Sequence, residues 1–236
     1  DSVSGSPFSI NKDFEMAVGF GLVEGYSQFE NIGNNPDVDT GALPEDAWSV
    51  GGTYNWMTAV TNLEVVSTSA SDTAAGAGAR TINVLGLDAN FVITNQIVTL
   101  NGTTPVAIPL PLYRINNIVA VTAGTSLNNV GDINIRNAGA GTIRGQIPAG
   151  VGVSRQAAFT VPNGYSLLLK QIMLDTESPA GSVSKYAKIV SYIKPNNGAV
   201  QLDLSFGNTN GTPHRLDLMP GVMLPEKTDF NLRITL

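Results

Sequence analysis

The sequence predicts an all-β protein made of antiparallel β-sandwich, jelly-roll-like domains, preceded by an extended N-terminal arm that carries a short helix. Three observations predict this class. Runs of about 5 to 10 β-branched and apolar residues recur from about residue 60 onward. Turn residues, mainly Gly, Asn, Asp and Pro, bound each run. No stretch shows the alternation of strands and helices that produces a parallel α/β sheet.

Residues 1–52 are predicted to form the arm, because they contain few alternating runs. Asn11 is placed to cap a short helix that reaches Gly25, with Phe14 and Met16 among its apolar contacts. The glycines inside that span weaken the helix, since each costs about 1 kcal/mol relative to Ala. An arm of this composition buries little by itself, so we expect it to lie against another surface.

Residues 53–150 are predicted to form a first sandwich. Its strands are expected at 62–68, 80–85, 90–100, 114–122, 132–136 and 142–147. Residues 86–90 form a short hairpin-type connection, and Asn101-Gly102 is a turn signal of the kind that needs positive φ.

Residues 151–236 are predicted to form a second sandwich after the Pro148-Ala149-Gly150 boundary. Its strands are expected at 155–161, 165–174, 185–193, 199–206, 213–218 and 230–236. The sequences 163–164 and 196–198 are predicted hairpin turns. The spacing of Tyr186, Ile189, Tyr192 and Ile193 indicates a strand that changes face or carries a bulge.

Charge and composition limit the classes of function. The net charge of −6 disfavours broad nucleic-acid binding, which needs clustered Lys and Arg. No apolar run approaches the roughly 20 residues of a membrane-spanning helix. Through residue 72 there are eleven carboxylates and one base, whereas eight acids and twelve bases follow. This asymmetry fits either an acidic segment that lies on a basic surface or a solvated acidic loop region.

Few residues offer chemistry, and we predict no catalytic, cofactor-binding or metal-binding residue. The chain has no Cys, and its one histidine, His214, is expected at the start of a strand. Asp37 and Asp39 have the spacing of the start of a calcium loop, but the later bidentate Glu is missing. Because Asp is also a good turn former, cation binding there stays open. The chain is therefore expected not to be an enzyme, although a hydrolase with paired carboxylates leaves little local trace.

Aromatic and other large apolar side chains of the arm are the candidate interaction residues. Their area is costly to leave exposed on a segment that has no core of its own. They are Phe8, Phe14, Met16, Phe20, Tyr26, Phe29, Trp48 and Trp56.

Several motifs resemble a family of tailed-bacteriophage virion structural proteins. Over roughly residues 33–150 they are NPDVDTG (35–41), PEDAW (44–48), SASDTAAGAGART (69–81), GLDAN (86–90), TLNGTTPV (99–106), RIN (114–116), TAG (122–124) and QIPAG (146–150). FTVPNG (159–164) and LPEKTD (224–229) fit the same pattern more loosely. The resemblance implies a place in the virion and no catalytic residues.

Together these observations predict a capsid decoration or cement protein, located on the exterior of a phage head. It would bridge subunits of the major capsid protein or of another virion protein, as a homo-oligomer for which a trimer is favoured. Neither nucleic acid nor a membrane is an expected partner, and no cofactor is expected. The alternative is a tail, baseplate or fibre component whose C-terminal sandwich binds a receptor or glycan.

Overall fold

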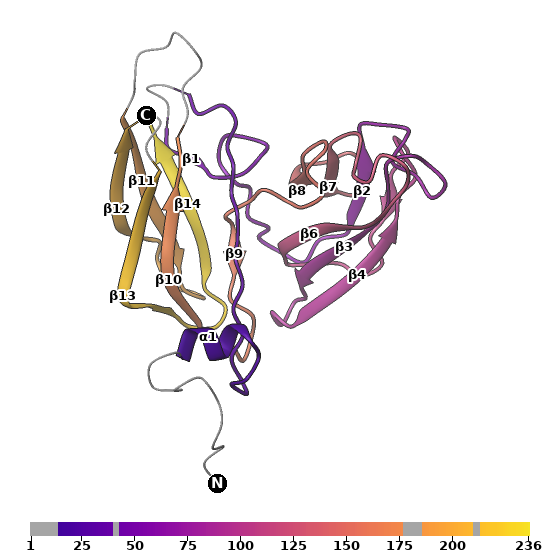
Figure 1. Ribbon diagram of the computed structural model, residues 1–236. Coiled ribbons are helices and arrows are strands. Elements are labelled where there is room, and N and C mark those ends of the chain that lie inside the picture. Colours follow the sequence, from indigo (N-terminus) through magenta and orange to yellow (C-terminus); the bar gives the residue numbers. More distant parts are fainter. Residues whose placement is uncertain (1–13, 40–42, 177–185, 210–212) are drawn as a thin grey trace. The chain divides into compact units, whose positions relative to one another are not determined.

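The computed structural model describes residues 14–39, 43–176, 186–209 and 213–236 of the chain (Figure 1). The chain divides into two compact units, residues 1–31 and residues 32–236. Among the described residues, the regular elements are strands apart from one short helix, and every pairing between the strands is antiparallel. The predicted all-β class is confirmed. The described part of the chain contains no helix with the length and apolar character needed to span a bilayer.

The helix α1 (Phe14–Gly19) is shorter than predicted. The N–H of Leu22 donates to the Ala17 carbonyl, and the N–H of Gly21 donates to the Val18 carbonyl. Such a pair of bonds ends a helix when the residue just after its last turn adopts positive φ. Here that residue is Gly21, which has φ of 69°. The expected extension to Gly25 is therefore wrong, because Gly21 ends the helix. The predicted cap, Asn11, lies outside the described residues.

The first sandwich packs a four-stranded sheet against a three-stranded sheet. The four-stranded sheet has the order β5 (Val106–Ala107), β2 (Leu63–Ser67), β7 (Ile133–Asn137) and β8 (Ile143–Ile147). The three-stranded sheet has the order β4 (Ile93–Thr99), β3 (Ala79–Leu87) and β6 (Arg114–Ala123). Alternate residues of both sheets form one buried core that includes Leu63, Ile82, Ile118, Ile133 and Ile147. The apolar residues of the alternating pattern thus form the inward face of each strand.

The second sandwich packs a five-stranded sheet against a two-stranded sheet. The larger sheet has the order β1 (Glu45–Asp46), β14 (Asp229–Thr235), β11 (Tyr186–Lys194) and β12 (Gln201–Thr209), with β9 (Phe159–Thr160) also on β14. The smaller sheet pairs β10 (Leu167–Leu174) with β13 (His214–Leu224). Val161, Ile193, Leu224 and Phe230 form the buried centre between them.

The structure refines the predicted elements in several places. Each of the twelve expected runs overlaps a strand, whereas β1 and β5, of two residues each, were not predicted. The last strand but one continues to Leu224 rather than ending at residue 218. The turn at 163–164 does not close a hairpin, because β9 pairs with β14 and β10 pairs with β13. The predicted irregularity in β11 is confirmed by a register shift between Val190 and Tyr192.

Candidate interaction surfaces

Five of the eight predicted interaction residues lie exposed in the N-terminal segment, defined here as residues 14–31. They are Phe14, Met16, Phe20, Tyr26 and Phe29, and Leu22 is exposed beside them. Phe20, Leu22 and Tyr26 each keep more than 60% of their surface accessible. Phe8 lies outside the described residues. A short segment that exposes this many large apolar side chains is typical of a binding surface.

Local structure holds these side chains in place. After α1, the turn that Gly21 closes is followed by a bond from the Tyr26 N–H to the Val23 carbonyl. The ring of Tyr26 then meets the ring of Phe14 edge to face, with 5.3 Å between centroids. The segment also carries Glu15, Glu24 and Glu30 and no Lys or Arg. It therefore offers a surface that is apolar and acidic at once.

The remaining two predicted residues, Trp48 and Trp56, pack within residues 32–236, where Trp48 is buried and Trp56 is partly buried. Trp48 is only 2% exposed and packs edge to face on Tyr54, at 5.0 Å. Tyr54 meets Trp56 in the same manner at 4.9 Å, and Trp56 stacks on Tyr192 at 6.4 Å. These rings join the stretch around residue 50 to β11. We therefore keep the prediction of a role in binding another molecule for the five exposed residues and not for the two tryptophans.

An ion pair that the sequence analysis missed joins the two sandwiches. Arg114, on β6, and Asp229, on β14, are 5% and 4% exposed. The Nε and a terminal nitrogen of Arg114 each donate to a different carboxylate oxygen of Asp229, both at 2.9 Å. Thr160 donates its hydroxyl to Asp229, and Arg114 also donates to the Met57 carbonyl. In the sequence, the only sign of this pair is that Arg114 begins an apolar run, and that position does not indicate which residue Arg114 contacts.

The surroundings of Arg114 favour its charged form. Burial lowers the pKa of Arg114, but the hydrogen bonds and the negative charge of Asp229 outweigh burial and raise it. The guanidinium also lies over the ring of Tyr113, 4.1 Å from its centroid. A cation placed over an aromatic face gains further stabilisation when it is shielded from water. The pair is thus a fixed, charged connection between sandwiches.

A second buried carboxylate ties β1 to β14. Asp46 is fully buried and accepts hydrogen bonds from the Tyr54 N–H and from Nε of Arg233. Burial raises the pKa of Asp46, and these two partners offset the increase only in part. Burial also raises the pKa of its neighbour Glu45, but hydrogen bonds from the backbone of Asp39, from Asn35 and from the backbone of Gly52 lower it below its usual range. Residues 45–54 are therefore anchored in the larger unit, residues 32–236, which is called the body below.

A third carboxylate organises loops of the first sandwich. Asp72 is fully buried, and its oxygens accept hydrogen bonds from the Ser67 hydroxyl and from the N–H groups of Ala79, Val130 and Gly131. Gly78 lies so close that a Cβ there would stand 2.1 Å from the carboxylate. The Gly/Ala-rich stretch after Asp72 thus lets the chain wrap around this side chain.

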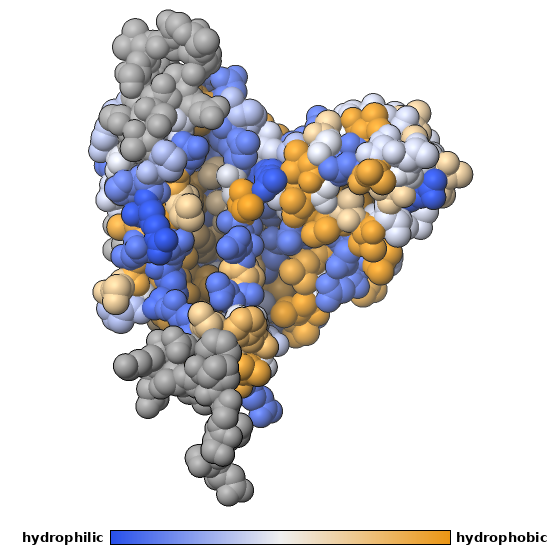
Figure 2. Space-filling model, viewed as in Figure 1, coloured by the Kyte–Doolittle hydropathy of each residue, from blue (hydrophilic) through white to orange (hydrophobic). Residues whose placement is uncertain are grey.

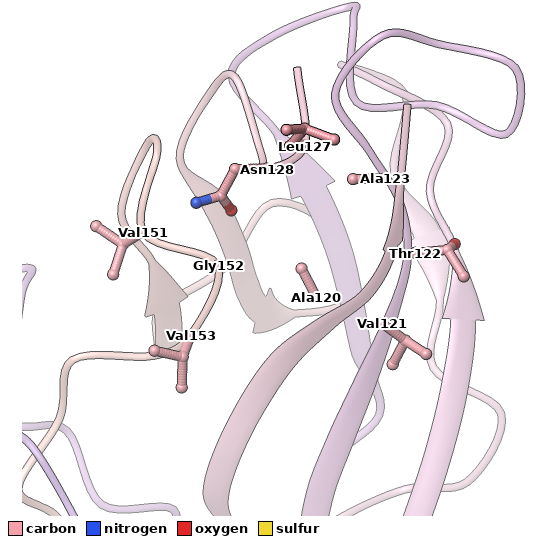
Figure 3. Close-up of a pocket in the computed structure, with 9 residues that line it drawn as sticks. All are labelled: Ala120, Val121, Thr122, Ala123, Leu127, Asn128, Val151, Gly152 and Val153. Carbon is pink, nitrogen blue, oxygen red and sulfur yellow. The ribbon is translucent and has the colours of Figure 1, made fainter. Parts of the chain in front are cut away.

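The outer surface of the three-stranded sheet is uncharged and partly apolar. Ile93 and Ile97 of β4 and Val119 and Val121 of β6 are exposed there, and Figure 2 shows apolar surface over these strands. At one end of β6 lies a shallow pocket of about 340 Å³, lined by nine residues between 120 and 153 (Figure 3). Its lining is aliphatic or small, with Thr122 and Asn128 as the polar members. Most of the surface that it exposes is polar, and none of its side chains is a carboxylate, an amine or an imidazole.

The other residues singled out by their chemistry are His214, Asp37 and Asp39. His214 is exposed at the start of β13, as predicted. The Asp37 N–H donates to the Asn35 side chain two residues before it, which is a turn-forming contact, and the Asp39 N–H donates to the Glu45 carboxylate. Among the described residues, no group of three or more His, Asp or Glu side chains is gathered closely enough to hold a metal ion.

Comparison with known proteins adds no assignment. Neither a protein-family model, nor a curated protein, nor a solved structure matches this chain.

Proposed function

We propose that this chain is a non-enzymatic structural protein of a phage particle, and specifically a capsid decoration protein that bridges subunits on the head exterior. The observation that carries the proposal is the N-terminal segment, a separate unit that exposes Phe14, Met16, Phe20, Tyr26 and Phe29. The resemblance of residues 33–150 to virion structural proteins supplies the setting.

The body has the properties that a load-bearing attachment needs. Two antiparallel sandwiches provide rigid sheets, and the Arg114–Asp229 pair connects them through two hydrogen bonds out of contact with water. Because a buried charge is costly to separate from its partner, this connection resists displacement of one sandwich from the other. A rigid body with a separate adhesive segment can hold a neighbouring subunit at a fixed spacing.

The composition of the N-terminal segment indicates how it would bind. Large apolar side chains gain about 25 cal/mol for each Å² that a partner covers. Glu15, Glu24 and Glu30 would guide the segment toward a basic area of a capsid subunit and exclude acidic ones. Aromatic residues are also enriched among those that dominate binding energy at interfaces. We therefore expect the segment, rather than the body, to supply most of the affinity for the particle.

Location on the particle is the first test. An antibody raised against residues 32–236 would be applied to tailed-phage particles purified from the source of the sequence and viewed by electron microscopy. Label on the head exterior is the expected result. Label confined to the tail or baseplate would instead support the receptor-binding or glycan-binding alternative. Particles that carry no label would remove the virion assignment.

The role of the segment is tested with a matched pair of variants. Phe20→Ser/Phe29→Ser removes two exposed rings from the segment, whereas Met219→Ser removes a side chain that is 88% exposed on β13. Both variants should keep the circular dichroism and melting temperature of the unaltered protein. We expect the first to lose rebinding to particles stripped of the protein and the second to keep it. Equal rebinding by both variants would show that the segment does not hold the particle.

A further inference from the structure

Strand β4 (Ile93–Thr99) leaves one edge of the three-stranded sheet open. Among the described residues it pairs with β3 only, and Figure 1 draws it at the margin of that sheet. The Asp88 N–H donates to the Val92 carbonyl, and the Leu100 N–H donates to the Arg80 carbonyl. In an antiparallel pair such bonds recur at every second residue. The even-numbered residues of β4 therefore bond to β3.

The odd-numbered residues consequently direct their N–H and C=O groups toward the open edge. They are Ile93, Asn95, Ile97 and Thr99, and all four side chains are exposed. Ile97 keeps 65% of its surface accessible. Exposed side chains, two of them the apolar Ile93 and Ile97, thus occur on the same four residues whose backbone groups face the open edge. An edge of this kind is a template for another strand.

The protections that usually block such pairing are missing from β4. Typical protections are a charged side chain, Pro, a bulge or a very short strand. β10 and β13 have a register shift between them and contain Lys170 and Pro220. β8 contains Arg144, and the pairing of β12 with β11 is also shifted. By contrast, the seven residues of β4 contain no charge, Pro or Gly, and pair with β3 without a shift.

We propose that β4 pairs with β4 of a second copy of this chain, in antiparallel orientation about a two-fold axis at Asn95. This register places Ile93 opposite Ile97 of the other copy on both sides of the axis, so two apolar pairs flank one Asn–Asn pair. Registers centred one or two residues later, at Gln96 or Ile97, give no more than one Ile–Ile pair. The two three-stranded sheets become one six-stranded sheet.

Electrostatics and the Asn95 side chain favour a second copy as the occupant. The protein carries a net charge of −6, so identical surfaces repel each other wherever their acids meet. The outward residues of β4 are uncharged, which lets two copies meet here without that cost. Asn83 donates to the Oδ1 atom of Asn95, so the amide group of Asn95 keeps its two hydrogens for donation to Asn95 of the other copy. This contact is separate from the N-terminal segment and goes beyond the proposed function.

Single-cysteine crosslinking tests the contact and its register together, because the chain contains no Cys. Residues directly opposite in a hydrogen-bonded antiparallel pair have Cα atoms about 5.5 Å apart, and disulfides span about 4.4–6.8 Å. Asn95→Cys should therefore form a covalent dimer on mild oxidation. Thr99→Cys is the control, since its two copies would lie about 27 Å apart along the strands. We expect at least about tenfold more dimer from Asn95→Cys on a non-reducing gel.

Mixed and charged variants complete the test. An equimolar mixture of Ile93→Cys and Ile97→Cys should crosslink, whereas neither should do so alone. Ile97→Lys should remove the dimer seen by analytical ultracentrifugation while the circular dichroism spectrum stays unchanged. The proposal is overturned if Asn95→Cys crosslinks no better than Thr99→Cys, if Ile97→Cys alone forms the dimer, or if the unaltered protein sediments as Ile97→Lys does.

Discussion

Replacing Asp229 by Asn tests how far the two sandwiches depend on their buried ion pair. The substitution keeps the size of the side chain but removes the negative charge that faces Arg114. The guanidinium would then stay charged and buried, with one partner fewer that can accept its hydrogen bonds. Thr160 would also face an amide in place of a carboxylate oxygen at 2.6 Å.

The expected loss is large because both members are shielded from water, at 5% and 4% exposure. Removing one partner of a buried pair costs about 3–5 kcal/mol, since it leaves an uncompensated charge. For a chain of this size, each kcal/mol lowers the melting temperature by about 2–4 °C. Asp229→Asn should therefore lower the melting temperature by about 6–20 °C.

Differential scanning calorimetry measures this change, and Asp217→Asn is the matched control. Asp217 also pairs with an arginine, Arg215, at 2.8 Å, but the two side chains are 51% and 62% exposed. Exposed pairs contribute little, because water screens both charges. The control should thus melt with the unaltered protein. If Asp229→Asn melts no earlier than Asp217→Asn, the buried pair does not hold the body together.

A double substitution separates the cost of an unpaired charge from the value of the pair. Arg114→Met/Asp229→Leu removes both charges and keeps apolar volume at both positions. Apolar replacements of buried ion pairs are often neutral or stabilising. The double variant should therefore melt above Asp229→Asn, although Thr160 and the Met57 carbonyl lose a partner. A double variant that melts lower than the single one would contradict this account.

Two further predictions concern carboxylates of the first sandwich. Asp72→Ala leaves four donors, three of them in buried hydrogen bonds, without their acceptor and should cost more than about 3 kcal/mol in urea unfolding; a loss below that of Asp217→Asn would be inconsistent with the network. Hydrogen bonds from the Gly139 and Ala140 N–H groups and from Arg136 lower the pKa of Glu64 from its usual 4.5. A depressed pKa gives stability that is present above 4.5 and is lost as the pH falls through the lower folded value. The difference in urea midpoint between the unaltered protein and Glu64→Gln should therefore shrink from about pH 7 to about pH 3, and a constant difference would refute the assignment.

The local pattern of the sequence was enough to predict the strands. Alternation of apolar and polar residues, as in 132–136, reflects the two faces of a pleated strand and needs no knowledge of the partner. Turn sequences such as Asn101-Gly102 predict positive φ, and Gly102 has φ of 61°. The end of the helix was harder to predict, because Gly19, Gly21 and Gly25 could each end it. Only Gly21 lies where the capping hydrogen bonds form.

The candidate site was predicted in part for a similar reason. Large apolar residues in a segment without an alternating pattern indicated exposure, and the structure shows Phe14, Phe20 and Tyr26 exposed. The same composition gave no means of separating these from Trp48, which packs on Tyr54 in the core. An aromatic residue has the same local appearance whether its ring meets solvent or a distant strand.

The sequence by itself determined the all-β class, the positions of most strands and the acidic, apolar character of the N-terminal segment. Only the tertiary structure decided which strands pair, that β1 joins β14 across the length of the chain, and that Arg114 meets Asp229. It also decided that β4 has an open edge. Secondary structure follows from periods of a few residues, whereas pairing between distant segments depends on how whole sheets pack, which no local pattern encodes.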